Sequence, residues 1–292
     1  MGDELASFSF KLCADDFALS PSVSDGILEA ISAGRLTSTC AMTNQPDWPR
    51  AASRLTLYRT LAEFGVHFNL TLGKPITSMP VLAPDDTFPT LGKIILMSLT
   101  GRLPEAEIRN EINAQLDAFE DATGVAPDFL DGHQHVHGLP GVRGWLLDEL
   151  TRRRANHSGF WLRDSSDRFG RIRARKFEAR KALIVAGLTR GFGVAARKRG
   201  FAVNDGFAGF SPFDASRDFA ADFASYLVAP GPQHLVMCHP GHCDEILRKY
   251  ENVVESREKE LDFLLSDRFS ACLQQAGARL TRPPARVIQT LG

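Results

Sequence analysis

The chain begins its regular structure with the stretch FSFKLCADDFALS, residues 8–20. Its apolar first part, Phe8–Cys13, is typical of a buried β-strand, and two adjacent acids, Asp15 and Asp16, follow it. A serine and a proline then supply helix-start signals, and we expect a helix at Ser22–Ala33. The stretch therefore predicts one β–α unit with two carboxylates at the carboxyl end of its strand.

Strand-like and helix-like segments continue to alternate along the chain. We expect further strands at Ser38–Thr43, Glu63–Leu70, Asp128–Asp131, Ser158–Leu162, Ala202–Val203, His234–Cys238 and Arg279–Leu280. We expect further helices at Ala51–Tyr58, Pro104–Thr123, Pro140–Arg153, Asp218–Leu227 and Glu255–Leu265, a mainly helical segment at Arg171–Arg199 with a break near Gly191–Gly193, and a long loop at Thr71–Pro89. Roughly seven βα units in one chain predict an α/β fold with a parallel sheet closed into a barrel. No GxGxxG or GxxxxGK motif indicates a nucleotide-binding sheet.

Histidines follow two of the later strands. GVHFNL, residues 65–70, carries His67, and DGHQHVHGLP, residues 131–140, carries His133, His135 and His137. Carboxyl ends of parallel strands meet at one edge of a barrel, where barrel enzymes carry their chemistry. One carboxylate and two imidazoles hold a divalent metal while leaving positions open for water and substrate. These stretches therefore predict a hydrolytic metal site.

Local geometry restricts which side chains can meet. In a regular strand Asp15 and Asp16 point to opposite faces, but a turn at the strand end lets both reach one site. His133, His135 and His137 alternate, so an extended chain would place all three on one face. The competing interpretations are helix capping for the aspartates, a hydrogen-bonded core position for His67, and a polar loop for the histidine cluster.

Four stretches in this order carry a family resemblance: LCADDFALSPSVSDGILEAISAGRLTSTCAMTN, GVHFNLTLGKPI, PDFLDGHQHVHGLPGV and LVMCHPGHCDE, residues 12–44, 65–76, 127–142 and 235–245. ESREKELDFLLSD, residues 255–267, also looks like a family segment. Together they resemble the YdjC-type carbohydrate deacetylases, which include chitooligosaccharide deacetylases and hopanoid-associated relatives. The resemblance implies a distorted, TIM-like (β/α) barrel similar to that of the polysaccharide deacetylases, and one metal ion.

The same resemblance implies roles for individual residues. Asp16, His67 and His133 would bind the metal, Asp15 would be the general base, and His239 would be an acid or an oxyanion partner. The turn at Pro240 and Gly241 would present His239 at the barrel mouth. Beside these we expect three substrate-binding residues, with alternatives: Asp131 would contact the substrate or hold a metal ligand in place, and His135 and His137 would line the pocket or orient neighbouring residues.

The predicted reaction is removal of acetyl groups from N-acetylated amino sugars or oligosaccharides. The cofactor would be one divalent metal ion; two imidazoles favour Zn²⁺, and the resemblance also allows Mg²⁺. Two alternatives remain open. One is an O-acetyl esterase on the same metal site, and the other is a non-enzymatic polyanion-binding module that uses residues 151–199.

Charge is distributed unevenly along the 292 residues, although the whole chain carries a net charge of −1. Residues 151–200 contain 15 Lys and Arg against three acids, Asp164, Asp167 and Glu178. We expect one domain, 1–292, with a basic helical insertion around 151–200 whose long side chains cover the barrel and pair with acids. A subunit interface, as in a homodimer, or a substrate lid is the alternative.

Other features concern compartment and partners. The N-terminal MGDELASFSF lacks the pattern of a signal peptide, and no apolar run approaches the length of a membrane span. Five scattered cysteines are expected to be free thiols. We therefore expect a cytoplasmic protein with a small-molecule or oligosaccharide substrate and no nucleic-acid partner.

Overall fold

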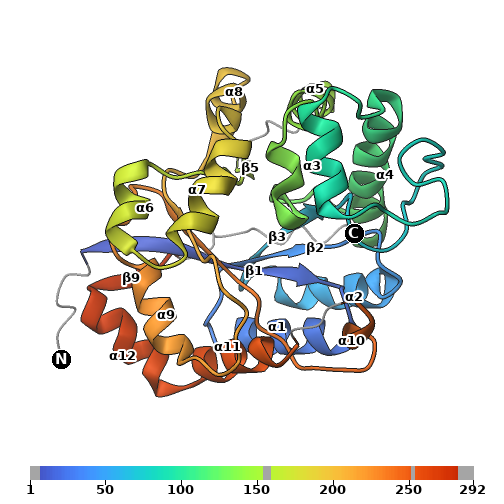
Figure 1. Cartoon of the computed structure of the whole chain (residues 1–292). Helices are drawn as coiled ribbons and strands as arrows, with labels where there is room; N and C mark the ends of the chain where they lie inside the picture. Colours follow the sequence, from blue (N-terminus) through green and yellow to red (C-terminus); the bar gives the residue numbers. More distant parts are fainter. Residues whose placement is uncertain (1–6, 154–158, 251–253, 282–292) are drawn as a thin grey trace.

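The computed structural model describes residues 7–153, 159–250 and 254–281, and a parallel sheet forms its centre (Figure 1). Its strands are β1 Phe8–Phe17, β2 Ser38–Ala41, β3 Glu63–Phe68, β4 Phe129–Gly132, β5 Trp161–Leu162, β6 Ala202–Val203, β7 Phe207–Ala208, β8 His234–Cys238 and β9 Ala278–Leu280. They follow the order β6-β5-β4-β3-β2-β1-β8-β7, and β9 pairs with the first residues of β1. Because all these ladders are parallel, the strands' carboxyl ends share one edge.

The two ends of this sheet lie close to each other. A flat sheet of this order would separate β6 from β7 by roughly 33 Å. Only residues 204–206 lie between these two strands, and so short a connection spans at most roughly 14 Å. The sheet therefore curls into a barrel, which is open between β6 and β7 within the described residues. This confirms the prediction of a distorted, TIM-like barrel.

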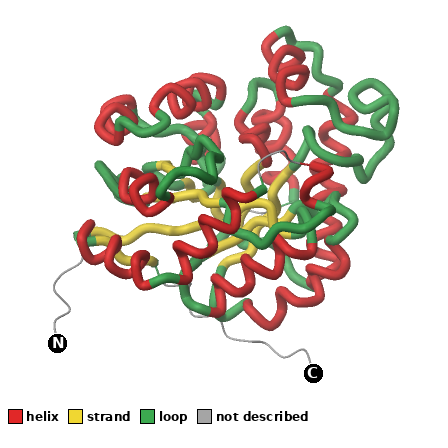
Figure 2. Tube along the Cα trace, turned by 60° about the horizontal axis from the view of Figure 1, so that its bottom comes forward, coloured by secondary structure: helices red, strands yellow, loops and turns green. Residues whose placement is uncertain are grey.

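Helices pack around the outside of the curled sheet (Figure 2). They are α1 Pro21–Ser32, α2 Trp48–Leu55, α3 Leu91–Leu99, α4 Glu105–Thr123, α5 Val142–Arg152, α6 Phe169–Arg175, α7 Ala179–Leu188, α8 Phe192–Lys198, α9 Phe219–Tyr226, α10 Leu247–Tyr250, α11 Glu255–Leu265 and α12 Asp267–Ala276, with a 3₁₀ turn, η1, at Thr56–Tyr58. The start of α1 matches its sequence signals: Ser20 Oγ accepts from the Val23 amide, and Pro21 is the first helical residue. Among the described residues, no helix has the length and apolar character that a bilayer crossing requires.

Most expected elements are present in the described residues. The strand Ala202–Val203, the strand His234–Cys238 and the helix Glu255–Leu265 have the predicted bounds. The sequence analysis missed α3, α10, α12 and β7. The missed strand β7 has only two residues.

The described part of the basic segment contains the last residues of α5, the strand β5 and three short helices, α6, α7 and α8. Gly191, at φ 86°, begins α8 at the predicted break. A second break, not predicted, separates α6 from α7, where Lys176 and Glu178 have φ of 61° and 44°. Many of its arginines pair with acids, as expected: Arg153 with Asp117, Arg171 with Asp205, Arg175 with Asp167, and Arg199 with Asp148.

Apolar side chains fill the layer of the barrel interior that lies one inward position below the carboxyl ends of the strands. Cys13, Phe129, Trp161 and Leu235 are buried there, and the rings of Phe129 and Trp161 stack with centroids 4.2 Å apart. Gly65 makes room for this pair, since a Cβ at that position would lie 2.6 Å from the Phe129 ring. Inward positions on a strand recur every second residue. The next inward positions toward the carboxyl edge are Asp15, His67, Asp131, Arg163 and Met237.

Candidate metal centre

The three predicted metal ligands lie together at the carboxyl ends of β1, β3 and β4. Asp16 Oδ1 is 3.1 Å from His133 Nδ1 and 3.3 Å from His67 Nε2. One ligand atom from each residue lies within 4.8 Å of the others, and all three side chains are buried. An acidic oxygen and two ring nitrogens in this arrangement fit a divalent cation, because the three atoms can contact one ion.

A change in backbone direction brings both adjacent aspartates to this site. Asp16 has φ of 69°, and the register of β1 against β2 shifts between Ala14 and Phe17. Aspartate tolerates this left-handed conformation better than most residues. Asp15 and Asp16 therefore line the same cavity, as the expected turn at the strand end requires.

The segment HQHVH does not continue as an extended strand, so the condition under which its three histidines would share one face is not met. Residues His133–Gly138 form a 3₁₀ turn, η2, in which Gln134 and His135 have φ of 51° and 64°. The ladder of β4 with β3 ends at Gly132, and no described strand pairs with the residues that follow. Without a ladder to keep it extended, the chain turns.

The turn sends the three rings in different directions. His133 faces Asp16, whereas His135 packs edge-on against Phe207 and Phe210. His137 turns into the interior, where its Nε2–H donates to the Arg163 carbonyl at 2.8 Å. Burial lowers the pKa of His137 to about 4 and that of His135 well below its usual value, so both rings are neutral near pH 7.

Asp131 orients the His67 ring. Its Oδ1 lies 2.6 Å from His67 Nδ1, which leaves Nε2 directed at Asp16. Burial opposes the charged form of the ring, but the carboxylates of Asp131, Asp16 and Asp15 raise the pKa of His67 to about 10. A carboxylate on one ring nitrogen of a histidine orients the ring and makes the other nitrogen more basic, and that nitrogen releases its proton when it binds an ion. Asp131 therefore holds the predicted ligand His67 in place through the ring nitrogen that does not face Asp16.

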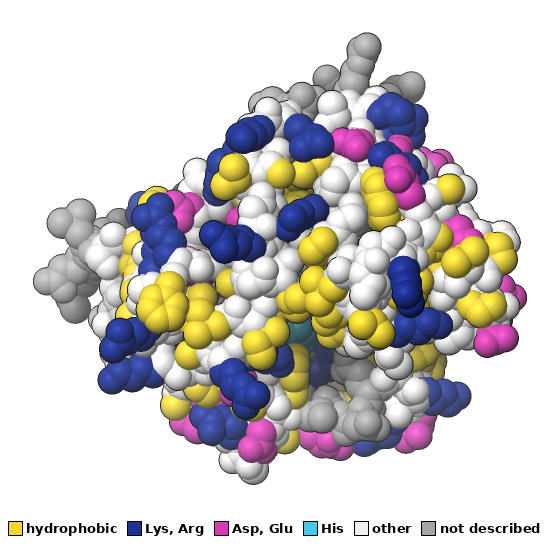
Figure 3. Space-filling view, turned by 45° about the horizontal axis from the view of Figure 1, so that its top comes forward, with side chains coloured by type: hydrophobic (Ala, Val, Ile, Leu, Met, Phe, Trp, Pro, Cys, Tyr) yellow, Lys and Arg dark blue, Asp and Glu magenta, His cyan; other side chains and the backbone are white. Residues whose placement is uncertain are grey.

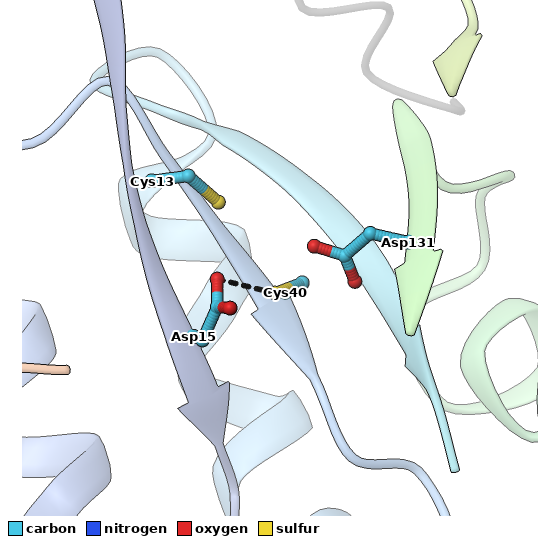
Figure 4. Close-up of side chains that lie close together, drawn as sticks. All are labelled: Cys13, Asp15, Cys40 and Asp131. Carbon is cyan, nitrogen blue, oxygen red and sulfur yellow. Dashed lines mark hydrogen bonds between the residues drawn. The ribbon is translucent and has the colours of Figure 1, made fainter. Parts of the chain in front are cut away.

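Arg163 connects Asp15 to Asp131. Its guanidinium donates two 2.6 Å hydrogen bonds to the oxygens of Asp15, and its Nη2 forms an ion pair with Asp131 Oδ2, also at 2.6 Å. Asp15 and Asp131 also form a second group of potential ligands with Cys13 and Cys40, drawn in Figure 4. The positive charge of Arg163 already lies against both carboxylates of that group.

Helix α11 contributes two charged side chains on the other side of Asp16. Arg257 Nη2 donates to Asp16 Oδ2 at 2.6 Å, and the carboxylate of Glu260 accepts from the His239 amide at 2.6 Å. Burial raises the pKa of Glu260 to about 7. The His239 ring packs edge-on against Phe213, with centroids 5.0 Å apart.

A cavity of about 260 Å³ opens over these groups. It is lined by Asp15, Asp16, His67, Leu91, His133, Gln134, His135, Lys181, Val185, Phe210, Ser211, Phe213, Met237, His239 and Arg257. In Figure 3 a histidine is visible inside a hollow with hydrophobic side chains gathered around it. Six of the eight predicted site residues line the cavity, whereas Asp131 and His137 are fully buried outside its lining.

Sequence reasoning missed Arg163, Arg257 and Glu260 as site residues. Arg163 follows the apolar strand end Trp161–Leu162, the same signal that identified Asp15. The two residues of α11 lie within ESREKELDFLLSD, which was assigned to the family without roles. No spacing in the sequence indicates that this helix reaches a strand end more than 200 residues away.

Fold and site together define a (β/α)-barrel protein with a candidate metal centre at the carboxyl ends of its strands. The chain belongs to the family described as YdjC-like protein, whose model matches residues 10–275.

Named relatives extend this similarity over nearly the whole chain. A chitooligosaccharide deacetylase of Citrobacter koseri is 33% identical over 269 residues, 91% of this chain and 94% of that protein. One of Klebsiella pneumoniae is 32% identical over 271 residues, again 91% and 94%. Among solved structures, an Enterococcus faecalis protein named for cellobiose-phosphate cleavage superposes with a TM-score of 0.69 at 23% identity, covering 94% of this chain and 97% of that one. That structural match supports the barrel fold.

Proposed function

We propose that the protein is a metal-dependent hydrolase that removes acetyl groups from N-acetylated amino sugars or oligosaccharides. The observation that carries the proposal is the meeting of Asp16, His67 and His133 beside Asp15 at one cavity. The two relatives that match over 91% of the chain are both named chitooligosaccharide deacetylase, which supports the same substrate class.

The donor set fits one divalent ion. Asp16, His67 and His133 would hold it, and when bound it would polarise the acetamide carbonyl and lower the pKa of water. Two imidazoles beside one carboxylate favour Zn²⁺, and Mg²⁺ is the second candidate. Metal analysis of protein purified without chelators distinguishes the two ions.

Asp15 is the proposed general base. It lines the cavity next to Asp16, within the space where water and an acetamide would meet. Arg163 holds both of its oxygens, yet each carboxylate oxygen retains a further acceptor position. Asp15 can therefore take a proton from the attacking water while Arg163 fixes its orientation.

His239 is the proposed acid. It follows β8, lines the cavity, and is positioned by the Glu260 carboxylate on its amide and by Phe213 against its ring. Histidine ordinarily titrates near neutrality, which suits proton donation to a departing amine. His135 is a neutral ring on the same wall, and we propose it as a substrate contact.

Of the two roles predicted for Asp131 and His137, substrate contact and support of neighbouring residues, this proposal assigns the second. Both are fully buried. Asp131 orients His67, and His137 holds the backbone of Arg163. We therefore propose that they position His67 and Arg163 and do not touch the substrate, because a buried side chain outside the cavity lining cannot reach a sugar.

Acetate release tests the proposed function. Purified protein is incubated with N-acetylated chitooligosaccharides after removal of metal, and again after Zn²⁺ or Mg²⁺ is restored. We expect acetate only with metal. Matched O-acetylated sugars test the esterase alternative, and equal or greater release from them would favour it. Acetate from neither substrate, together with salt-sensitive binding to polyanions, would favour the binding module.

Compartment and assembly remain predictions. The described cysteines are free thiols, as expected, which favours a cytoplasmic location. A homodimer also remains a prediction, and sedimentation of the purified protein tests it.

A further inference from the structure

The two oxygens of Asp16 have different partners. Oδ1 faces the rings of His67 and His133, at 3.3 and 3.1 Å. Oδ2 accepts from Arg257 Nη2 at 2.6 Å. Both side chains are almost fully buried, at 2–3% exposure, so solvent does not compete for this ion pair.

We propose that Arg257 is a positioning residue that restricts Asp16 to ligation through one oxygen and weakens cation binding by its own positive charge. The inference rests on the proposed metal centre and deepens it. A cation that bound Asp16 Oδ2 would lie close to the Arg257 guanidinium, which is 2.6 Å from that oxygen, and repulsion between the two positive charges disfavours ligation through it. One coordination position then stays open for water or the acetamide carbonyl.

The charges around the site support this role. With the His67 ring neutral, as a metal ligand must be, the carboxylates of Asp15, Asp16 and Asp131 and the guanidiniums of Arg163 and Arg257 together carry one negative charge, which becomes one positive charge when a divalent ion binds. Without Arg257 the same groups would carry two negative charges, and the ion would neutralise them. Since charges interact strongly at buried sites, removal of Arg257 favours the ion.

Arg163 and Arg257 differ in whether they contact a proposed metal ligand. Arg163 binds Asp15 and Asp131 but no proposed ligand directly. Arg257 contacts the ligand itself and lines the cavity. The Arg257 side chain comes from α11, a helix outside the barrel. A substitution of Arg257 therefore changes no residue of the strands that carry the ligands.

The test compares Arg257→Met with Arg257→Lys. Metal-free protein is titrated with Zn²⁺ in competition with a chromophoric chelator, and the visible absorption of the Co²⁺-loaded protein reports coordination number. For Arg257→Met we expect Zn²⁺ binding at least tenfold tighter, a changed Co²⁺ spectrum, and kcat reduced at least tenfold at saturating metal with little change in KM. Arg257→Lys keeps the charge with a shorter reach. We therefore expect near-normal affinity with an altered Co²⁺ spectrum.

Arg175→Met is the matched control. Arg175 is also a buried arginine, but it donates to the carbonyls of Phe207, Val228 and Ala229 and lies outside the cavity lining. We expect lower stability with unchanged Zn²⁺ affinity. Zn²⁺ affinity that falls or stays within twofold in Arg257→Met would overturn the inference, as would a wild-type Co²⁺ spectrum in both variants. If Arg257→Met does not fold, the Arg257→Lys spectrum decides. Failure of wild-type protein to bind Zn²⁺ would instead contradict the proposed function.

Discussion

The described residues contain two groups of potential metal ligands inside or at the mouth of the barrel, and the groups differ in what lies between their polar atoms. In the group formed by Cys13, Asp15, Cys40 and Asp131, the Arg163 guanidinium forms ion pairs with both carboxylates. In the group formed by Asp16, His67 and His133, the three ligand atoms face one another beside the cavity. A ligand-like set of residues is therefore insufficient, because a cation also needs a position that no protein charge already occupies.

The largest expected effect comes from His67→Ala, which removes one ligand from the second group. We expect Zn²⁺ affinity to fall at least about 100-fold and acetate release to be lost. Calorimetric titration with Zn²⁺ and an acetate assay measure the two effects. His242→Ala is the control, since that exposed ring pairs with Glu29 outside the cavity lining. Wild-type Zn²⁺ affinity in His67→Ala would assign the ion elsewhere.

Asp15→Asn tests whether the first group takes part in turnover while the second group binds the metal. The variant retains Asp16, His67 and His133, so we expect it to bind Zn²⁺ as the wild type does. Because the amide is a poor proton acceptor, kcat should fall about 10²- to 10⁴-fold. Steady-state kinetics at saturating Zn²⁺ measures the effect. Full turnover in this variant would refute Asp15 as the base.

Arg163→Met tests whether the first group depends on its arginine. The substitution leaves Asp15 and Asp131 as buried carboxylates without their shared partner, and breaking such a pair typically costs about 3–5 kcal/mol of unfolding free energy. Urea denaturation measures this loss. The control is Arg168→Met, whose side chain is 73% exposed in its pair with Asp205 and should contribute less than about 1 kcal/mol. Equal losses in the two variants would contradict the account.

His234, a buried histidine outside the site, makes the stability of the fold depend on pH. Burial lowers the pKa of His234 to about 4, and its Nε2–H donates to the Tyr226 carbonyl. Between pH 6.5 and pH 4 the unfolded chain binds a proton that the folded ring does not. Stability therefore falls as the pH falls through this window, by about 3 kcal/mol from this ring.

Urea denaturation from pH 7.5 to pH 4.5 measures this slope, and His234→Gln should reduce it. An unchanged slope in that variant would show that other groups cause the acid sensitivity.

The strand ends and the ligand set could be predicted from sequence because they are local. An apolar run followed by Asp15 and Asp16, and another that contains His67, place these groups at the carboxyl edge once the barrel is inferred. The orientation of the histidine cluster could not be predicted, since the end of the β4 ladder decides it. Alternation alone would have kept His133, His135 and His137 on one face.

The arginines that pair with the site carboxylates could not be predicted from the sequence for a different reason. Arg163 and Arg257 meet Asp15 and Asp16 across 148 and 241 residues, and no local pattern encodes such a pairing. The excess of arginine in residues 151–200 was visible, yet composition cannot separate Arg163, which enters the site, from Arg168, which is exposed. The sequence thus predicts the ligands better than the groups that set their charge and orientation.

Anomalous diffraction from crystals soaked in Zn²⁺ tests the central claim most directly. The account predicts one strong peak per chain, about 2.0–2.2 Å from Asp16 Oδ1 and from one ring nitrogen each of His67 and His133, with Arg163 still between Asp15 and Asp131. A peak among Cys13, Asp15, Cys40 and Asp131 with Arg163 displaced, or no peak in crystals of protein that releases acetate, would contradict it.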